Sequence, residues 1–144
     1  MASGRNKRKR ERTLKLGRQF MAQVGQIVAS QIVTRALHLG YGIKDKPHKT
    51  HKQRRGKGES LGAYSKTHGK KRQKSGKDIS SVRLYFTGNM SRQFRLIESK
   101  VTKTKAPIGF TGQSVRYGIY THKQRPWIGI SRQDRKVIEI SVRK

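Results

Sequence analysis

In Ser81-Val82-Arg83-Leu84-Tyr85-Phe86-Thr87-Gly88-Asn89-Met90-Ser91-Arg92-Gln93-Phe94, a long basic run ends and an apolar pattern begins. Over residues 81–86 apolar and polar side chains alternate, which is the period-two pattern of a half-buried strand. Thr87-Gly88-Asn89 then supplies turn chemistry, because Gly tolerates positive φ and Asn bonds its own backbone. A second alternating run follows at residues 94–98. The stretch therefore predicts a strand, a tight or short helical turn, and a second strand.

More strands are predicted towards the C-terminus. The second strand is expected to continue to Lys103 with a basic outer face, and one or two more are expected between residues 106 and 120, where Val115, Tyr117 and Ile119 alternate with smaller or polar residues. Short turns between successive strands imply an antiparallel meander of three to four strands. Pro126 cannot donate to a ladder, so its segment is expected at an edge or outside the sheet, with Trp127 as a core or interface anchor.

A long amphipathic helix is predicted over residues 13–39. Its apolar stripe recurs at spacings of three and four, and its polar residues, Arg35 included, are expected on the other faces. Gly17 and Gly25 each cost roughly 1 kcal/mol of helix propensity relative to Ala, so packing must hold the helix together. Gly40-Tyr41-Gly42 is a natural C-terminal stop. The main interpretation is a helix that packs on the sheet, and the alternative is a coiled-coil or partner helix.

A short C-terminal helix is predicted from about Arg132. Ser131 can cap it, and Asp134 lies three residues on, in the first turn, where a negative charge is favourable. Residues 137–142 also alternate, so the sequence leaves a strand open there. The fold class that results is α+β: a long N-terminal helix packed on a small antiparallel sheet, with a short C-terminal helix.

Charge is the strongest signal in the composition. The 144 residues include 36 Lys and Arg against 7 Asp and Glu, a net charge of +29 with a pI near 11.6. Such an excess works against compaction and favours a polyanionic partner, with nucleic acid as the leading class. We expect no membrane partner, because there is no long apolar run and no lipidation signature. The absence of cysteine excludes disulfides and a thiol nucleophile, and the basic N-terminus lacks the apolar stretch of a signal peptide.

Two basic segments flank the predicted helix. Residues 1–12 are expected to form a solvated tail or an arm that folds on a phosphate backbone. Residues 13–144 are expected to form one domain with a long basic loop at about 44–78, rich in glycine and without regular elements through most of its length. The candidate nucleic-acid-binding residues are Arg8, Arg10, Arg54, Arg55, Lys70, Lys71, Arg72 and Lys74, with a solvated loop as the alternative interpretation.

The sequence argues against an enzyme and predicts no cofactor and no metal. Gly56-Lys57-Gly58 lacks the spacing of a Walker A loop. His48, His51 and His68 stand among lysines without a completing cysteine or carboxylate cluster. The seven acids are too dispersed for a metal-dependent nuclease. Ser65, His68 and Asp78 could be combined on paper, but no nucleophile elbow accompanies them.

Three segments, in order, resemble the tail-completion (virion morphogenesis) and neck proteins of tailed bacteriophages. Leu61-Gly62-Ala63-Tyr64-Ser65-Lys66-Thr67-His68-Gly69-Lys70-Lys71 resembles their Tyr-Ser-x-x-(Tyr)-x-Lys segment. Leu84-Tyr85-Phe86-Thr87-Gly88-Asn89-Met90 is similar to their Leu-x-x-Thr-Gly-x-Met/Leu signature. Arg125-Pro126-Trp127-Ile128-Gly129-Ile130-Ser131-Arg132-Gln133-Asp134 is similar to their Arg-Pro-Phe/Trp-Leu-Gly-Leu-Ser-x-x-Asp segment. Where the family carries His-x-x-Gly, this chain has Thr121-His122-Lys123-Gln124.

The resemblance implies a small α+β subunit that forms a ring, typically six-fold, at the head–tail junction of the virion. It implies neighbouring neck, connector and tail proteins as partners, and genomic DNA in the channel. The residues that carry the motif are Tyr64, Ser65, Thr87, Gly88, Met90, Arg125, Pro126, Trp127 and Gly129. A ribosomal or other RNA-binding structural protein is the alternative, because such proteins also combine a small core with basic arms.

Overall fold

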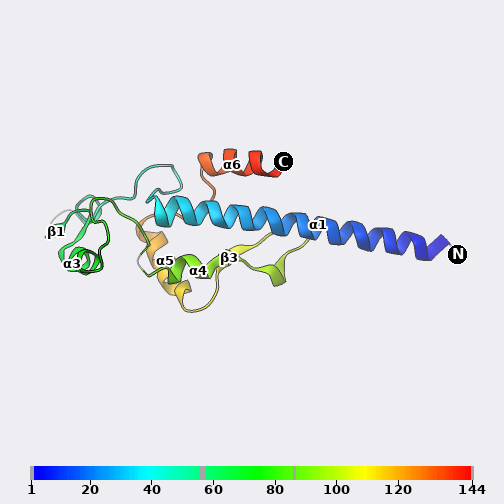
Figure 1. Ribbon diagram of the computed structural model, residues 1–144, viewed down its shortest axis with the longest axis horizontal. Helices are drawn as coiled ribbons and strands as arrows, with labels where there is room; N and C mark the ends of the chain where they lie inside the picture. Colours follow the sequence, from blue (N-terminus) through cyan, green and yellow to red (C-terminus); the bar gives the residue numbers. More distant parts are fainter. Residues whose placement is uncertain (1, 56–57, 86, 144) are drawn as a thin grey trace.

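The protein has an α+β architecture built along one long helix. The computed structural model describes residues 2–55, 58–85 and 87–143, with side chains from Arg10 onward. Helix α1 (Ala2–Val33) forms the long axis, and its N-terminal part projects beyond the rest of the chain (Figure 1). Helix α6 (Arg132–Arg143) lies along one side of α1 (Figure 1). On the opposite side lie α4 (Asn89–Gln93), β3 (Phe94–Leu96), β4 (Ile108–Phe110) and α5 (Ser114–Gln124).

The remaining elements form a small lobe past the C-terminal end of α1 (Figure 1). It contains α2 (His51–Arg55), β1 (Ser60–Leu61), β2 (Tyr64–Ser65) and α3 (Lys66–Lys74). Outside this lobe, a short 3-10 helical turn, η2 (Glu98–Lys100), follows β3. Within the described residues, no helix combines the length and apolar character needed to cross a membrane.

The predicted N-terminal helix is present and is longer than predicted. It begins at Ala2 instead of Thr13, so the segment expected as an arm continues the helix. It ends in a π-helical turn, η1 (Thr34–His38), in which Leu39 N–H donates to the Thr34 carbonyl across five residues (2.9 Å). Gly40 follows with φ +82°, as expected of a glycine stop.

The predicted sheet of three to four strands is replaced by two small antiparallel pairs. Strand β1 pairs with β2, and β3 pairs with β4 in the register Phe94↔Phe110 and Leu96↔Ile108. The strand expected up to Lys103 stops at Leu96, before η2. The α+β class therefore stands, with far less strand than the alternation predicted.

The strand expected at residues 81–86 is wrong over residues 81–85, because side chains take the place of a neighbouring strand. Phe86, the last residue of that prediction, lies outside the described residues. Val82 is buried in a small apolar cluster, yet Arg83 pairs with no strand. Instead, the Tyr64 hydroxyl donates to the Arg83 carbonyl (2.9 Å) and accepts from Arg83 N–H (2.7 Å). Arg72 Nη1 donates to the Tyr85 carbonyl (2.9 Å). These bonds satisfy the N–H and carbonyl of Arg83 and the carbonyl of Tyr85 without a ladder.

The strand expected at residues 114–120 is also wrong, because this segment is helix α5. Its alternating side chains, Tyr117 and Ile119 among them, are exposed, so the alternation does not mark a buried face. The buried side of the helix is made instead by Gly118 and Thr121. A Cβ at Gly118 would clash with the Phe110 ring, so only glycine lets the helix approach β4 this closely.

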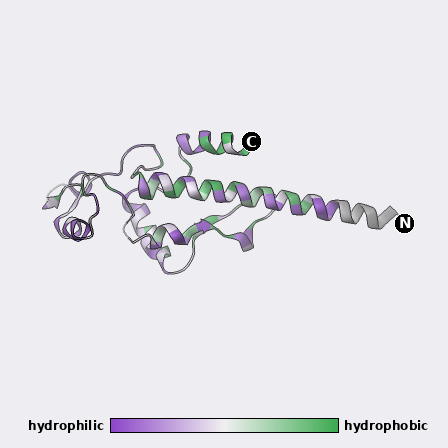
Figure 2. Ribbon diagram, in the orientation of Figure 1, coloured by the Kyte–Doolittle hydropathy of each residue, from purple (hydrophilic) through white to green (hydrophobic). Residues whose placement is uncertain are grey.

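The basic loop expected at residues 44–78 is more structured than predicted. Thr50 and Gln53 form a reciprocal capping box at the start of α2, with Gln53 Oε1 accepting from Thr50 N–H (2.9 Å). Helix α3, which is hydrophilic along its length (Figure 2), packs on β1 through buried Gly69, next to Leu61. Its order comes from these contacts, since its own sequence carries no apolar stripe.

The core lies between α1, α4, β3 and the segment after α5. Phe94, Phe110 and Trp127 form an aromatic cluster with ring centroids 5.1–5.7 Å apart, and Trp127 is fully buried. The buried core residues are Val28, Ile32, Ala36, Leu37, Met90, Phe94 and Trp127. Of the two roles predicted for Trp127, core or interface anchor, the structure shows the core role.

The predicted C-terminal helix is confirmed with its cap. Asp134 N–H donates to Ser131 Oγ (3.0 Å), and Ser131 N–H donates to Asp134 Oδ2 (3.0 Å). This reciprocal arrangement is a capping box with aspartate in the place of glutamate. Helix α6 starts at Arg132 and resolves the open choice between helix and strand in favour of helix.

Candidate nucleic-acid interface

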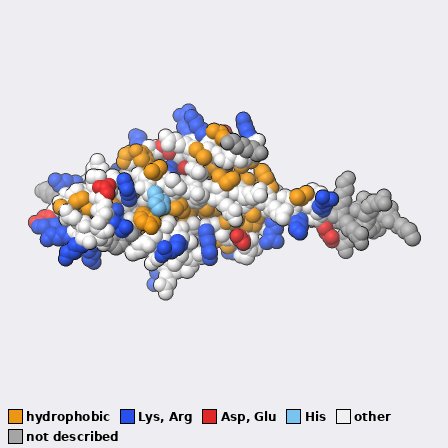
Figure 3. Space-filling view, viewed as in Figure 1, with side chains coloured by type: hydrophobic (Ala, Val, Ile, Leu, Met, Phe, Trp, Pro, Cys, Tyr) orange, Lys and Arg blue, Asp and Glu red, His pale blue; other side chains and the backbone are white. Residues whose placement is uncertain are grey.

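The predicted phosphate-contacting residues fall into three groups, which are exposed, buried or set in a cavity wall. Arg10, Arg55, Lys70, Lys71 and Lys74 are exposed. Three of them lie on α3, and Lys and Arg side chains gather over the lobe that carries this helix (Figure 3). The side chain of Arg8 lies outside the described residues. The exposed group provides a cationic surface of the kind that contacts a phosphate backbone without reading bases.

Arg72 is placed in the interior, unlike its neighbours on α3. It is 3% exposed, its guanidinium lies 4.6 Å from the centroid of the Tyr64 ring, and Nε donates to the Asp78 carbonyl (3.1 Å). Together with its bond to Tyr85, these contacts tie α3 to the segment that follows it. Arg72 therefore stabilises the lobe, whereas Lys70, Lys71 and Lys74 face solvent.

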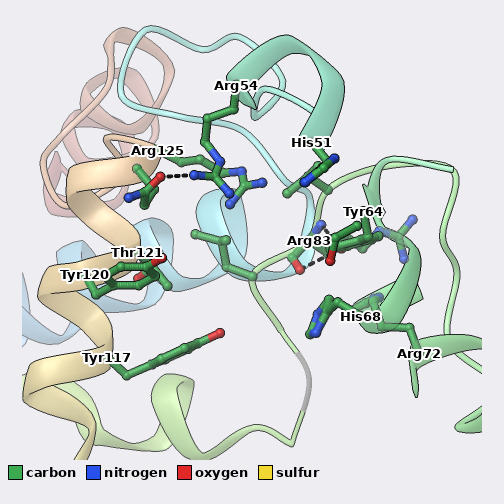
Figure 4. A pocket seen from close by; sticks show the side chains of 14 residues that line it. His51, Arg54, Tyr64, His68, Arg72, Arg83, Tyr117, Tyr120, Thr121 and Arg125 are labelled. Carbon is green, nitrogen blue, oxygen red and sulfur yellow. Dashed lines mark hydrogen bonds between the residues drawn. The ribbon is translucent and has the colours of Figure 1, made fainter. Parts of the chain in front are cut away.

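Arg54 lies in a cavity of about 280 Å³ between α2, α3, α5 and the segment 82–84 (Figure 4). Helix α2 presents His51 and Arg54 to it, and α5 presents Tyr117 and Tyr120 from the facing wall (Figure 4). The full lining is His51, Arg54, Tyr64, Ser65, His68, Arg72, Val82, Arg83, Leu84, Tyr117, Tyr120, Thr121, Gln124 and Arg125. None of these described lining residues is acidic.

The electrostatics of the cavity are those of crowded positive charge. Burial lowers the pKa of Arg125, and the nearby Arg54 guanidinium lowers it further. Burial also lowers the pKa of His68, with Arg72 and Lys71 acting in the same direction. Burial raises the pKa of the Tyr64 hydroxyl, which keeps it neutral and able to donate to Arg83.

Two polar atoms in the cavity wall lack a partner among the described residues. They are His51 Nδ1 and Arg54 Nε, both buried. Arg54 Nη1 donates to the Gln124 side-chain carbonyl, and Arg125 Nε donates to the Lys49 carbonyl (3.0 Å), so the two guanidiniums are held in place by neutral acceptors. A buried donor without an acceptor costs about 1–3 kcal/mol, which an anionic ligand could recover.

The first two motif segments have structural roles in the described chain. Tyr64 anchors Arg83, and Ser65 stands at the N-cap of α3 and lines the cavity. Gly88 adopts φ +81° at the N-cap of α4, with Thr87 Oγ1 accepting from Asn89 N–H (3.5 Å). Met90 is buried in the core. The Thr-Gly-x-Met pattern thus sets the turn that starts α4 and directs Met90 inward.

The third motif segment is organised by Arg35. Arg35 Nε donates to Asp134 Oδ2 (2.7 Å), and Nη2 donates to the carbonyls of Trp127 (3.1 Å) and Gly129 (2.7 Å). The Pro126 carbonyl accepts from Ile43 N–H (3.2 Å), which holds the same segment from its other side. Residues 125–134 are therefore fixed to Arg35 and Ile43 through three backbone carbonyls and the Asp134 carboxylate.

Sequence reasoning missed Arg35 and the two cavity tyrosines. The helical pattern places Arg35 on a solvent face, but it is 6% exposed. One signal in the sequence could have pointed to Arg35. Asp134 is one of only seven acids and stands three residues after a capping serine, and a buried carboxylate there needs a cationic partner. A strand would place Tyr117 and Tyr120 on opposite faces. In a helix their spacing of three places them side by side.

Comparison with known proteins gives no family assignment. No protein-family model matches the chain, and no match was found among curated proteins or among solved structures. In the described part of the chain, no group of three or more His, Cys, Asp or Glu side chains converges as a metal site would require.

Proposed function

We propose that this chain is a structural protein of a tailed-bacteriophage virion, a ring-forming neck or tail-completion subunit at the head–tail junction. It is made in the host cytoplasm and assembles with neighbouring neck, connector and tail proteins around the DNA path. It acts by binding and positioning, without catalysis or a cofactor.

The observation that carries the proposal is the set of apolar side chains that one copy leaves exposed on separate helices. On α1, Leu14, Leu16 and Phe20 are 49–59% exposed. On α6, Ile140 is 60% exposed and Val137 is 41% exposed. Leu16 and Phe20, and likewise Val137 and Ile140, are one helical turn apart, so each pair forms a patch on one helix face. Exposed apolar patches mark interaction surfaces, and a closed ring of heterologous contacts would cover different faces of each copy.

The charge supports DNA as the polymer inside the ring. With 36 basic and 7 acidic residues, the chain cannot neutralise itself. Exposed Lys70, Lys71 and Lys74 on α3 can each neutralise a phosphate through contacts that carry no sequence information. Backbone contacts of this kind suit a channel through which a genome passes.

The three motif segments support the same family. They lie at structurally important points: Tyr64 anchors the lobe, Gly88 starts α4, and Trp127 fills the core. Their order along the chain and their spacing match the resemblance.

The test is the location of the protein in particles. Mass spectrometry of gradient-purified virions, from a host in which the phage genome is expressed, is expected to detect the chain together with portal and tail proteins. Absence from virions, with copurification of a monomer on ribosomal RNA, would instead support the RNA-binding alternative.

A further inference from the structure

The cavity between α2, α3 and α5 is a built site that a DNA channel alone does not explain. It is lined by α2, β2, α3, α5 and the segment 82–84 of one copy, and Arg54 and Arg125 converge on it from α2 and from the end of α5 (Figure 4). The exposed lysines of α3 face solvent, whereas these guanidiniums line a recess. The recess is therefore distinct from the general positive charge of the surface.

We propose that this cavity binds the phosphate of a nucleotide or of a nucleic-acid strand, with the adjoining base against Tyr117 and Tyr120. The site lies within a single copy, so it does not depend on ring formation. It adds a discrete binding pocket to the basic surface.

The phosphate part of the proposal follows from the unpartnered polar atoms and the charges of the cavity wall. Arg54 Nε and His51 Nδ1 are buried and have no partner among the described residues. Arg54 and Arg125 lie close enough for the charge of one to lower the pKa of the other, and no described acid lines the cavity. An oxyanion between them would remove this repulsion and accept charge-assisted hydrogen bonds from both guanidiniums.

The base part of the proposal follows from the tyrosines. Tyr117 and Tyr120 are 55% and 52% exposed, so their rings stand at the mouth of the cavity. Every base has a π-face that can stack on an aromatic ring, and proteins that hold single strands combine such rings with a positive groove. An acidic peptide would satisfy the arginines but would leave these rings without a matching partner.

The size of the cavity fits the same ligand. Its volume of about 280 Å³ is at the small end of ligand pockets, which span roughly 300–1,000 Å³. It can hold a phosphate and part of a sugar, with the base outside against the tyrosines.

The test measures the binding of thymidine 5′-monophosphate to the full chain by isothermal titration calorimetry. The salt concentration is about 0.15 M, which screens diffuse charge effects. We expect saturable binding of one nucleotide per chain. Arg54→Gln is expected to weaken nucleotide binding about tenfold, in line with the loss of hydrogen bonds to a charged group.

The matched control is Arg55→Gln, which removes the same charge from the next, exposed position. It is expected to change the affinity less than about twofold, because a surface charge is largely screened at this salt concentration.

A second pair of variants tests the tyrosines without touching the arginines. Tyr117→Ala is expected to weaken nucleotide binding roughly fivefold or more, as for other base-stacking residues, and to leave the binding of inorganic phosphate unchanged. Its control is Ile119→Ala, an exposed residue of α5 that does not line the cavity. Because Tyr117 and Ile119 are both about half exposed, neither substitution should unfold the chain.

Three results would overturn the proposal. The first is no saturable binding of the nucleotide to the wild-type chain. The second is an equal decrease in affinity in Arg54→Gln and Arg55→Gln, which would show diffuse charge attraction. The third is that inorganic phosphate or a glutamate-rich peptide binds the cavity at least as tightly as the nucleotide does, with the same sensitivity to Arg54→Gln.

Discussion

Arg35 connects parts of the chain that are far apart in the sequence. It reaches from the end of α1 to Asp134 on α6, and to the Tyr41, Trp127 and Gly129 carbonyls. A buried guanidinium is tolerated only when its charge and its donors are matched, and here a carboxylate and three carbonyls do so. Asp134 has a second role in the capping box of α6, so one carboxylate both starts that helix and fixes it to α1.

Removing Asp134 should be strongly destabilising. Asp134→Ala leaves Arg35 buried without its counter-charge, and breaking a buried pair typically costs about 3–5 kcal/mol. Urea unfolding at matched protein concentration measures the change. Lys66→Ala is the control, because Lys66 pairs with Glu59 at 2.7 Å on the surface, where such pairs contribute about 0–1 kcal/mol. Equal destabilisation of the two variants would contradict the role assigned to Asp134.

His48 should make stability depend on pH. Burial lowers the pKa of His48 from 6.5 to about 4, against the raising effect of its bond to the Ala36 carbonyl (3.1 Å). Between these values the unfolded chain binds the proton and the folded chain does not, so the free energy of unfolding falls as the pH falls from about 6.5 to about 4. Above pH 6.5 this contribution is complete.

Thermal unfolding of His48→Gln across this range measures the effect. We expect a flatter dependence of the melting temperature on pH than in the wild-type chain. His51→Gln is the matched control, since it introduces the same side chain at a histidine that is only partly buried, and the wild-type slope should remain. An unchanged slope in His48→Gln would assign the pH dependence to another group, such as His68.

At the scale of elements, structure set by local signals was predictable, and structure set by long-range contacts was not. The apolar stripe of α1 and the Ser131–Asp134 cap of α6 identify both helices, because each signal is local. The alternation at residues 81–86 and 114–120 is misleading, since long-range contacts decide both segments. Tyr64 and Arg72 bond the first segment, and Gly118 lets the second approach Phe110 as a helix.

The candidate site was predictable in its exposed part and in single residues such as Arg54, but not as a cavity. Lys70, Lys71 and Lys74 stand out as a basic cluster in the sequence and are exposed in the structure. The cavity could not be found in this way, because its walls come from α2, α3, α5 and the segment 82–84, which only the tertiary structure brings together. Arg72 shows the same limit, because neither its position nor its type distinguishes it from its exposed neighbours.

The glycines of α1 should respond to alanine in opposite ways. A Cβ at Gly25 would lie 2.5 Å from Leu96 Cδ1 and 2.9 Å from Ala106 Cβ. Such overpacking costs about 1–3 kcal/mol and outweighs the gain of roughly 1 kcal/mol in helix propensity. At Gly17 the nearest atom is Lys103 Cβ at 3.3 Å, in an exposed loop that can move.

Urea unfolding of the two variants tests this packing. Gly25→Ala is expected to lower the free energy of unfolding, and Gly17→Ala is expected to leave it unchanged or raise it. A stabilising Gly25→Ala would mean that α1 does not lie against β3 as closely as described.

The exposed lysines of α3 should set part of the salt dependence of DNA binding. Replacing Lys70, Lys71 and Lys74 by Gln is expected to reduce the slope of log affinity against log salt by about 0.9 for each phosphate that is no longer neutralised. Fluorescence anisotropy with a duplex at several salt concentrations measures the slope. The control replaces Lys100, Lys103 and Lys105, which are also exposed but lie far from α3, near the middle of α1. An unchanged slope in the α3 variant would mean that α3 does not contact the DNA, and equal decreases in both variants would mean that α3 has no special part in the contact.

At the scale of the whole molecule, one copy is incomplete in two respects. It carries a net charge of +29, and it exposes apolar side chains along α1, α5 and α6. Self-repulsion opposes assembly of such chains unless a polyanion is present, whereas the apolar faces favour assembly. Copies and DNA should therefore assemble together.

The apolar face of α6 should contribute to that assembly. Ile140→Gln is expected to shift the protein towards smaller species in sedimentation velocity experiments with DNA, because Ile140 is 60% exposed in one copy and would be covered in a ring. Glu139→Gln, the neighbouring exposed position with the same introduced side chain, is the control. If both variants assemble as the wild-type chain does, α6 does not take part in the interface between copies.

The most direct test of the proposed ring is to measure the mass and shape of the protein with and without duplex DNA. Mass photometry gives the mass, and negative-stain microscopy gives the shape. We predict closed rings of several copies, favoured by the duplex and weakened by high salt. Single copies under every condition, with the projecting part of α1 ordered and the duplex without effect, would contradict the proposed assembly.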